Sequence, residues 1–92
     1  MKIYDKVSWH IDGGEDENDV INRFREIIDF LQRTQMLNDE GKEAVQIGID
    51  AEFSLHDRML NKEGKNFLDK YYDKALENGV LSVGKYLEEK YA

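Results

Sequence analysis

The hydrophobic positions of this chain repeat with the period of an α-helix in three stretches. Between residues 18 and 36, the apolar residues fall on one helical face, and they are Val20, Ile21, Phe24, Ile27, Ile28 and Leu31. Similar stripes run over residues 67–75 and 83–91. We therefore expect helices over these stretches, the second of them beginning after Asn61 and ending at Asn78 before a glycine.

The N-terminal residues follow a different pattern. Val7, Trp9 and Ile11 alternate with polar residues, which is typical of a half-buried strand. No hairpin partner follows in sequence, so we expect either a short strand or an extended arm laid over the helices with Trp9 as its anchor. The pair Gly13-Gly14 then ends the segment.

The middle of the chain carries two conflicting signals. Apolar and polar residues alternate from Val45 to Leu55, which is the pattern of a strand. Asn38, however, stands where a helix N-cap would, and acidic residues follow it in the first turn. We expect a helix over residues 39–49, followed by irregular chain or a short helical turn from Ser54 to Met59.

Two stretches of the sequence resemble each other and argue for that helix. The first is MLNDEGKEAVQIGID, beginning at Met36, and the second is MLNKEGKNFLDKYYD, beginning at Met59. Asparagine is the expected N-cap in both, and Gly41 and Gly64 fall at the third helical position. Glycine there costs about 1 kcal/mol relative to alanine. We therefore expect each glycine to let another segment, such as the N-terminal arm, pass close to the helix.

Composition limits the class of protein. Ninety-two residues with 40% hydrophobic content are enough for one domain with a single core, and we expect a mainly α fold of about four helices, with the N-terminal strand or arm added. The chain has no cysteine, and no apolar run suits a signal peptide or a membrane span, so a cytoplasmic location is expected. The net charge of −7 disfavours nucleic acid and suits a basic protein partner.

Four acidic residues precede the first long helix, and they are Glu15, Asp16, Glu17 and Asp19. Negative charge at a helix N-terminus is stabilising, and Asp16 or Asn18 would cap this helix. Asp19 and Arg23 have the spacing of a favourable ion pair within one helix. The run is thus interpreted first as a solvated helix start and second as a docking surface for a basic partner.

The two histidines offer the only candidate chemistry. His10 is followed closely by Asp12, and His56 is followed directly by Asp57. Such residues would suit a divalent metal or a general base. No metal-ligand spacing, nucleophile motif or phosphate loop accompanies them, so we expect no cofactor.

Residues at both ends of the chain resemble a small bacterial family of uncharacterised domains, which carries YDxxSWH near its start and LNxEGxxFxxxYY near its end. The matching residues are Tyr4-Asp5, Ser8-Trp9-His10, Asp50, Phe53, Leu60-Asn61, Glu63-Gly64, Phe67 and Tyr71-Tyr72. The similarity leaves residues 15–45 unmatched. It implies an acidic single-domain protein of the kind found as immunity partners of secreted toxins, and it supplies no catalytic residues.

Three functions are consistent with these observations. The first is a non-enzymatic domain that binds a basic partner, steered by the four acids between Glu15 and Asp19 and anchored through Trp9 beside His10. The second is a small enzyme or metal protein that uses His10 and His56. The third is a structural homo-oligomer.

Overall fold

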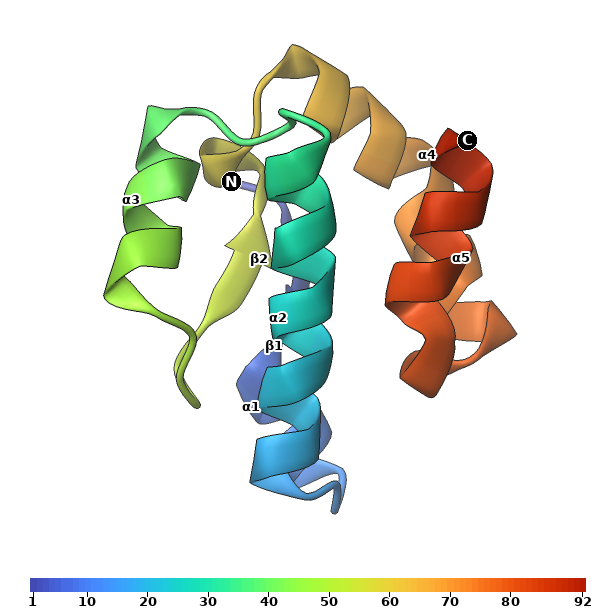
Figure 1. The fold of residues 1–92 in the computed structure, drawn as a ribbon. Coiled ribbons are helices and arrows are strands. Elements are labelled where there is room, and N and C mark those ends of the chain that lie inside the picture. The colour runs from blue at the N-terminus through green and yellow to red at the C-terminus, as the bar shows by residue number, and fades with distance from the viewer.

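A long central helix, α2, organises the fold, and the other elements pack around it (Figure 1). The computed structural model describes residues 1–92. Its elements are β1 (Ile3–Lys6), α1 (Val7–Asp12), α2 (Glu17–Arg33), α3 (Asp39–Ile47), β2 (Ser54–His56), α4 (Lys62–Asn78) and α5 (Val83–Tyr91), with 3-10 turns η1 (Asp57–Met59) and η2 (Val80–Ser82). The expected mainly α fold is confirmed, and the short helix α1 adds to the helices that were predicted.

The N-terminal strand exists, but it lies earlier than predicted. β1 pairs antiparallel with β2, placing Ile3 opposite His56 and Asp5 opposite Leu55. The predicted strand over Val7, Trp9 and Ile11 is wrong, because these residues belong to α1. A strand would put all three side chains on one face. In the helix, by contrast, Val7 is completely buried while Trp9 is 52% exposed.

The ambiguous middle segment divides between helix and strand. Residues 39–47 form the predicted helix, α3, and the side chain of Asn38 caps it. The strand β2 at Ser54–His56 contradicts the expected irregular chain, whereas the predicted helical turn appears at η1. Period-two alternation becomes a strand only here because β1 supplies a hydrogen-bonding partner, which the isolated pattern cannot reveal.

The first long helix ends three residues earlier than predicted. Arg33 is its last residue, and Gln35 adopts a left-handed conformation with φ of 59°. The backbone N–H of Met36 then donates to the carbonyl of Leu31 at 2.9 Å. This turn directs Met36 and Leu37 into the core, where both are buried.

The two similar stretches meet each other in space. Leu37 and Leu60 form an isolated antiparallel bridge. The N–H of Asn38 donates to the carbonyl of Met59, and the N–H of Asn61 donates to the carbonyl of Met36. Each asparagine also caps its own helix through its side-chain oxygen. The repeat therefore builds a reciprocal pairing of two helix starts, which we call the asparagine clasp.

The clasp explains the glycine at the third position of each helix. A Cβ added to Gly41 would lie 2.2 Å from the carbonyl oxygen of Met59, and one added to Gly64 would lie 2.6 Å from that of Met36. The predicted close approach is confirmed. The approaching segment is the other copy of the repeat, and the suggested N-terminal arm is not involved.

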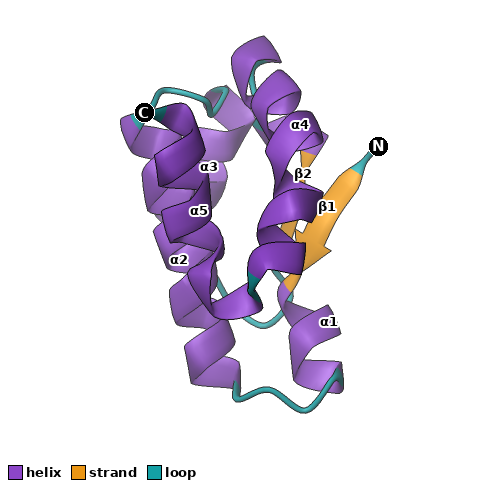
Figure 2. Cartoon of the chain, turned by 90° about the vertical axis from the view of Figure 1, so that its right-hand side faces the viewer, coloured by secondary structure: helices purple, strands orange, loops and turns teal.

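The core lies between the sheet, α2, α4 and α5. Eighteen buried hydrophobic residues form one cluster, which includes Phe30, Leu55 and Tyr72. Figure 2 shows α2 and α5 running side by side. None of the helices combines the length and the apolar character that a membrane crossing requires.

Candidate functional site

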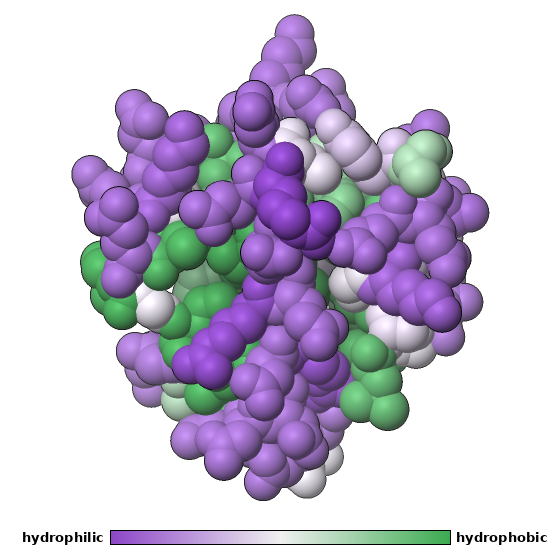
Figure 3. Space-filling model, viewed as in Figure 1, coloured by the Kyte–Doolittle hydropathy of each residue, from purple (hydrophilic) through white to green (hydrophobic).

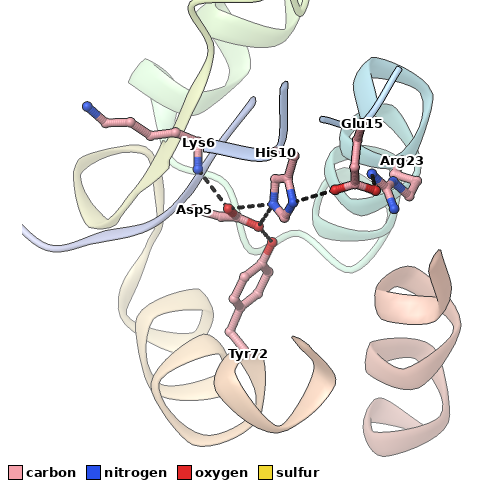
Figure 4. A network of polar contacts seen from close by, with 6 residues as sticks. All are labelled: Asp5, Lys6, His10, Glu15, Arg23 and Tyr72. Carbon is pink, nitrogen blue, oxygen red and sulfur yellow. Dashed lines mark hydrogen bonds and ion pairs between the residues drawn. The ribbon is translucent and has the colours of Figure 1, made fainter. Parts of the chain in front are cut away.

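A buried carboxylate on β1 is the centre of a polar network (Figure 4). Asp5 is only 3% exposed, and it is the one charged residue among the buried residues of the chain. Its oxygens accept hydrogen bonds from the backbone N–H of Lys6 at 2.9 Å and from the hydroxyl of Tyr72 at 2.8 Å. The Nε2 atom of His10 lies 2.9 Å from the same carboxylate. The buried charge is thus surrounded by donors, as a stable buried carboxylate requires.

The network continues through His10 to α2. The Nδ1 atom of His10 lies 3.0 Å from a carboxylate oxygen of Glu15, whose other oxygen accepts from Arg23 at 2.6 Å. The imidazole also meets the ring of Phe24 edge-on, with 5.9 Å between ring centres. Both ring nitrogens of His10 face carboxylates, and only the protonated ring can donate from both.

Two groups of the network have shifted pKa values. The guanidinium of Arg23 holds the pKa of Glu15 below its usual value, and His10 acts in the same direction. Burial raises the pKa of the Tyr72 hydroxyl well above its usual value, and the neighbouring Asp5 adds to this effect. Glu15 is therefore stabilised as an anion, whereas Tyr72 is stabilised as a neutral hydrogen-bond donor.

The network joins four elements of the fold. Asp5 comes from β1, His10 from α1, Arg23 from α2 and Tyr72 from α4. None of the four surface hollows is lined by Asp5 or His10. The geometry of the network fixes the position of α1 against α2 and the sheet.

The helix-internal ion pair predicted between Asp19 and Arg23 is wrong. Arg23 pairs with Glu15, which lies before the helix, and Asp19 has no ion-pair partner. The reason is the loop at Gly13-Gly14, which turns the chain so that Glu15 can meet both His10 and Arg23. Among the four acids proposed for steering, Glu15 is thus the one engaged by His10 and Arg23.

Trp9 on α1 and the remaining acids at the start of α2 are exposed to solvent. Trp9 is 52% exposed, and the ammonium of Lys6 lies 5.9 Å from its ring centre. Asp16 caps α2 by accepting from the N–H of Asp19. Asp16, Glu17 and Asp19 are all exposed. An aromatic side chain and three carboxylates are therefore displayed where α1 leads into α2, and we call this surface the Trp9 corner.

His56 lies in a different setting from His10. It belongs to β2 and lines a hollow between the sheet and α3, and its Nδ1 atom is covered without a hydrogen-bond partner. His10 instead contacts Asp5, Glu15 and Phe24, so the two histidines share no partner. No three histidine, aspartate, glutamate or cysteine side chains are grouped to hold a metal.

Sequence reasoning missed three members of the network, and they are Asp5, Arg23 in its observed pairing, and Tyr72. Asp5 precedes His10 by five residues, which matches no local helical or strand contact. Tyr72 lies 67 residues from Asp5 in sequence. The one available signal was that Tyr4-Asp5 and Tyr71-Tyr72 both belong to the two terminal motifs on which the predicted resemblance was based.

Comparison of the chain with family models, with curated proteins and with solved structures found no match. The resemblance based on the two terminal motifs therefore stays a prediction.

Proposed function

We propose that this protein is a non-enzymatic binding domain that docks on a basic partner protein through the Trp9 corner. The observation that carries the proposal is the exposure of Trp9 on a helix that is fixed from behind. Tryptophan is enriched among residues that dominate binding energy at interfaces. An exposed tryptophan on a preorganised element loses little conformational freedom on binding.

The exposed acids at the start of α2 determine the kind of partner. Asp16, Glu17 and Asp19 are exposed and make no ion pairs with side chains of this chain. The whole chain carries a net charge of −7. An acidic surface attracts a basic protein and raises the association rate, most strongly at low salt.

We propose further that binding acts by occlusion, as an immunity or inhibitor protein covers the working surface of its target. The two terminal motifs and the acidic composition support this part. In this mechanism the His10 network would position Trp9 for binding. It holds α1 in place while the Trp9 side chain stays exposed.

The experiment is a pull-down with the tagged protein from lysate of its host, at low and at moderate salt, followed by mass spectrometry. We expect one basic protein to be retained in stoichiometric amount at low salt and to be lost as salt rises. The Trp9→Ala variant should fail to retain it even at low salt. Recovery of the protein alone would overturn the proposal and favour a homo-oligomer.

A charge-matched pair of variants tests the steering residues. The test variant carries Asp16→Asn, Glu17→Gln and Asp19→Asn, and it keeps Glu15 because that residue holds the network. The control variant removes three exposed acids elsewhere, on α3, α4 and α5, through Glu40→Gln, Glu63→Gln and Glu89→Gln. The association rate should fall for the test variant much more than for the control. Equal effects would show that only net charge matters.

A further inference from the structure

A groove opens between α3 and the face of the sheet that is turned away from the core. Its volume is about 490 Å³. Leu55 and Asp5 point to the other side of the sheet and are buried, so the groove lies on the accessible face. The apolar residues that line it are Met1, Ile3, Ala44, Ile47, Phe53 and Met59. The volume lies within the range of ligand-binding clefts in proteins.

The groove exists because only the start of α3 is fully buried, whereas Ala44 and Val45 further along pack only partly against the core. Gly41 is the only buried residue of α3, and it lies against the carbonyl of Met59 in the asparagine clasp. Further along the helix, Ile47 is 87% exposed. A second hollow of about 330 Å³, lined by Val45 and Ile49, lies on the side of α3 that faces α2. Figure 3 shows apolar surface over α3 and in the hollow beside α2.

Acidic residues outnumber lysine and arginine in the lining of the groove. Asp50 and Glu52 line it and are exposed. The one lysine of the lining, Lys6, has its ammonium near the ring of Trp9. Lys6 thereby makes the groove continuous with the Trp9 corner. A partner seated on Trp9 would reach the groove directly.

We infer that this groove receives an aliphatic or aromatic side chain from a basic segment of the partner protein, with lysine or arginine beside it facing Asp50 and Glu52. This inference rests on the proposed function and specifies a second contact for the same partner. Burying the exposed apolar side chain of Ile47 against such a segment is favourable. The rim carboxylates would select basic over acidic segments by charge complementarity.

The probe for this inference is a library of random peptides displayed on phage and selected against the immobilised protein. Enriched peptides should combine an aliphatic or aromatic residue with lysine or arginine. A synthetic copy should change the amide NMR signals of Ile3, Ile47 and Phe53. Acidic peptides, no enrichment, or signal changes confined to other elements would overturn the inference.

Two highly exposed apolar residues give a matched pair of variants. Ile47→Ser should weaken binding of the selected peptide by about tenfold or more, as expected for an interface anchor. Leu81→Ser should not, because Leu81 is 79% exposed in η2 and does not line the groove. Equal effects of the two substitutions would count against the groove. Both variants should fold, since neither side chain is buried.

The outcome also separates this inference from the proposed function. If Trp9→Ala abolishes capture of the lysate partner while Ile47→Ser leaves both capture and peptide binding intact, the Trp9 corner stands and the groove inference fails. If Ile47→Ser weakens peptide binding and Trp9→Ala does not affect partner capture, the groove stands and the Trp9 corner fails.

Discussion

Asn38 and Asn61 bond reciprocally to each other's segments. The N–H of Asn38 donates to the carbonyl of Met59 at 3.1 Å, and the N–H of Asn61 donates to that of Met36 at 2.9 Å. Their side-chain amides repeat the exchange by donating to the carbonyls of Arg58 and Gln35, both at 2.7 Å. The two helix starts are therefore joined by hydrogen bonds whose acceptors are backbone carbonyls, and a side-chain substitution leaves these acceptors in place. The close approach depends instead on the glycines behind them.

Substitution of Gly41 by alanine should destabilise the protein. The new Cβ would lie 2.2 Å from the carbonyl oxygen of Met59, which belongs to the backbone and cannot move without breaking the clasp. Overpacking of this kind costs about 3 kcal/mol, which the better helix propensity of alanine offsets by about 1 kcal/mol. We expect a net loss near 2 kcal/mol in the free energy of unfolding, measured by urea denaturation.

Gly84 provides the control for that substitution. It lies in α5, and a Cβ there would lie 3.6 Å from Glu26, an ordinary contact. Gly84→Ala should therefore stabilise the protein by about 0.5 to 1 kcal/mol through helix propensity alone. If Gly41→Ala and Gly84→Ala shift stability in the same direction, the clasp does not have the tight geometry described here.

Removal of the Asp5 carboxylate should have a large effect. Asp5→Ala leaves the Tyr72 hydroxyl without its acceptor, and it removes one of the two carboxylates that face His10, at a buried position. Loss of one partner from a buried charged network costs about 3 to 5 kcal/mol. Tyr72→Phe removes a single hydrogen bond and should cost only about 1 to 2 kcal/mol. Additivity of the two effects in a double-mutant cycle would disprove the coupling of the two residues.

Acid should weaken the protein through Glu15. The pKa of Glu15 is lowered below its usual value of 4.5 by Arg23, so the folded state binds the proton less tightly than the unfolded chain. The stabilisation is present above the unfolded-state pKa and is lost as pH falls through the folded-state pKa. We expect Glu15→Gln to reduce stability at neutral pH and to flatten the decline between neutral and acidic pH. An unchanged pH profile would contradict the pairing.

Alkaline titration should separate the tyrosines. Burial and the neighbouring Asp5 raise the pKa of Tyr72, and burial with a hydrogen bond to Asp69 raises that of Tyr4. Their contribution to stability is present below the unfolded-state pKa and is lost as pH rises through the folded-state value. The phenolate absorbance of the folded protein should therefore show two of its five tyrosines ionising late. Tyr72→Phe should remove one of these late transitions. Ionisation of all five near the ordinary pKa would refute the burial of these hydroxyls.

The helices were predictable because their signals are local. The stripe from Val20 to Leu31 determines which face of α2 is buried, and an asparagine N-cap with at least one acidic residue in the first turn marks where α3 and α4 begin. The strands were less predictable, because β1 finds its partner about fifty residues later in β2. Alternation near Val7 was therefore assigned to the wrong element.

The candidate site divides in the same way. The sequence alone identified Trp9, His10 and the acidic run, since these stand out by residue type. The sequence did not reveal that His10 would turn inward to Asp5 while its neighbour Trp9 stayed exposed. Successive residues of a helix point in different directions, and this segment was not predicted to be a helix.

By itself, the sequence determined the helical class, the acidic surface and the repeated helix start, since composition, periodicity and capping act within a few residues. Only the tertiary structure decided that the two repeats pair, that Tyr72 reaches Asp5, and that a groove stays open beside α3. These depend on contacts between segments far apart in the chain, where the path of the backbone and the packing of the core set the distances.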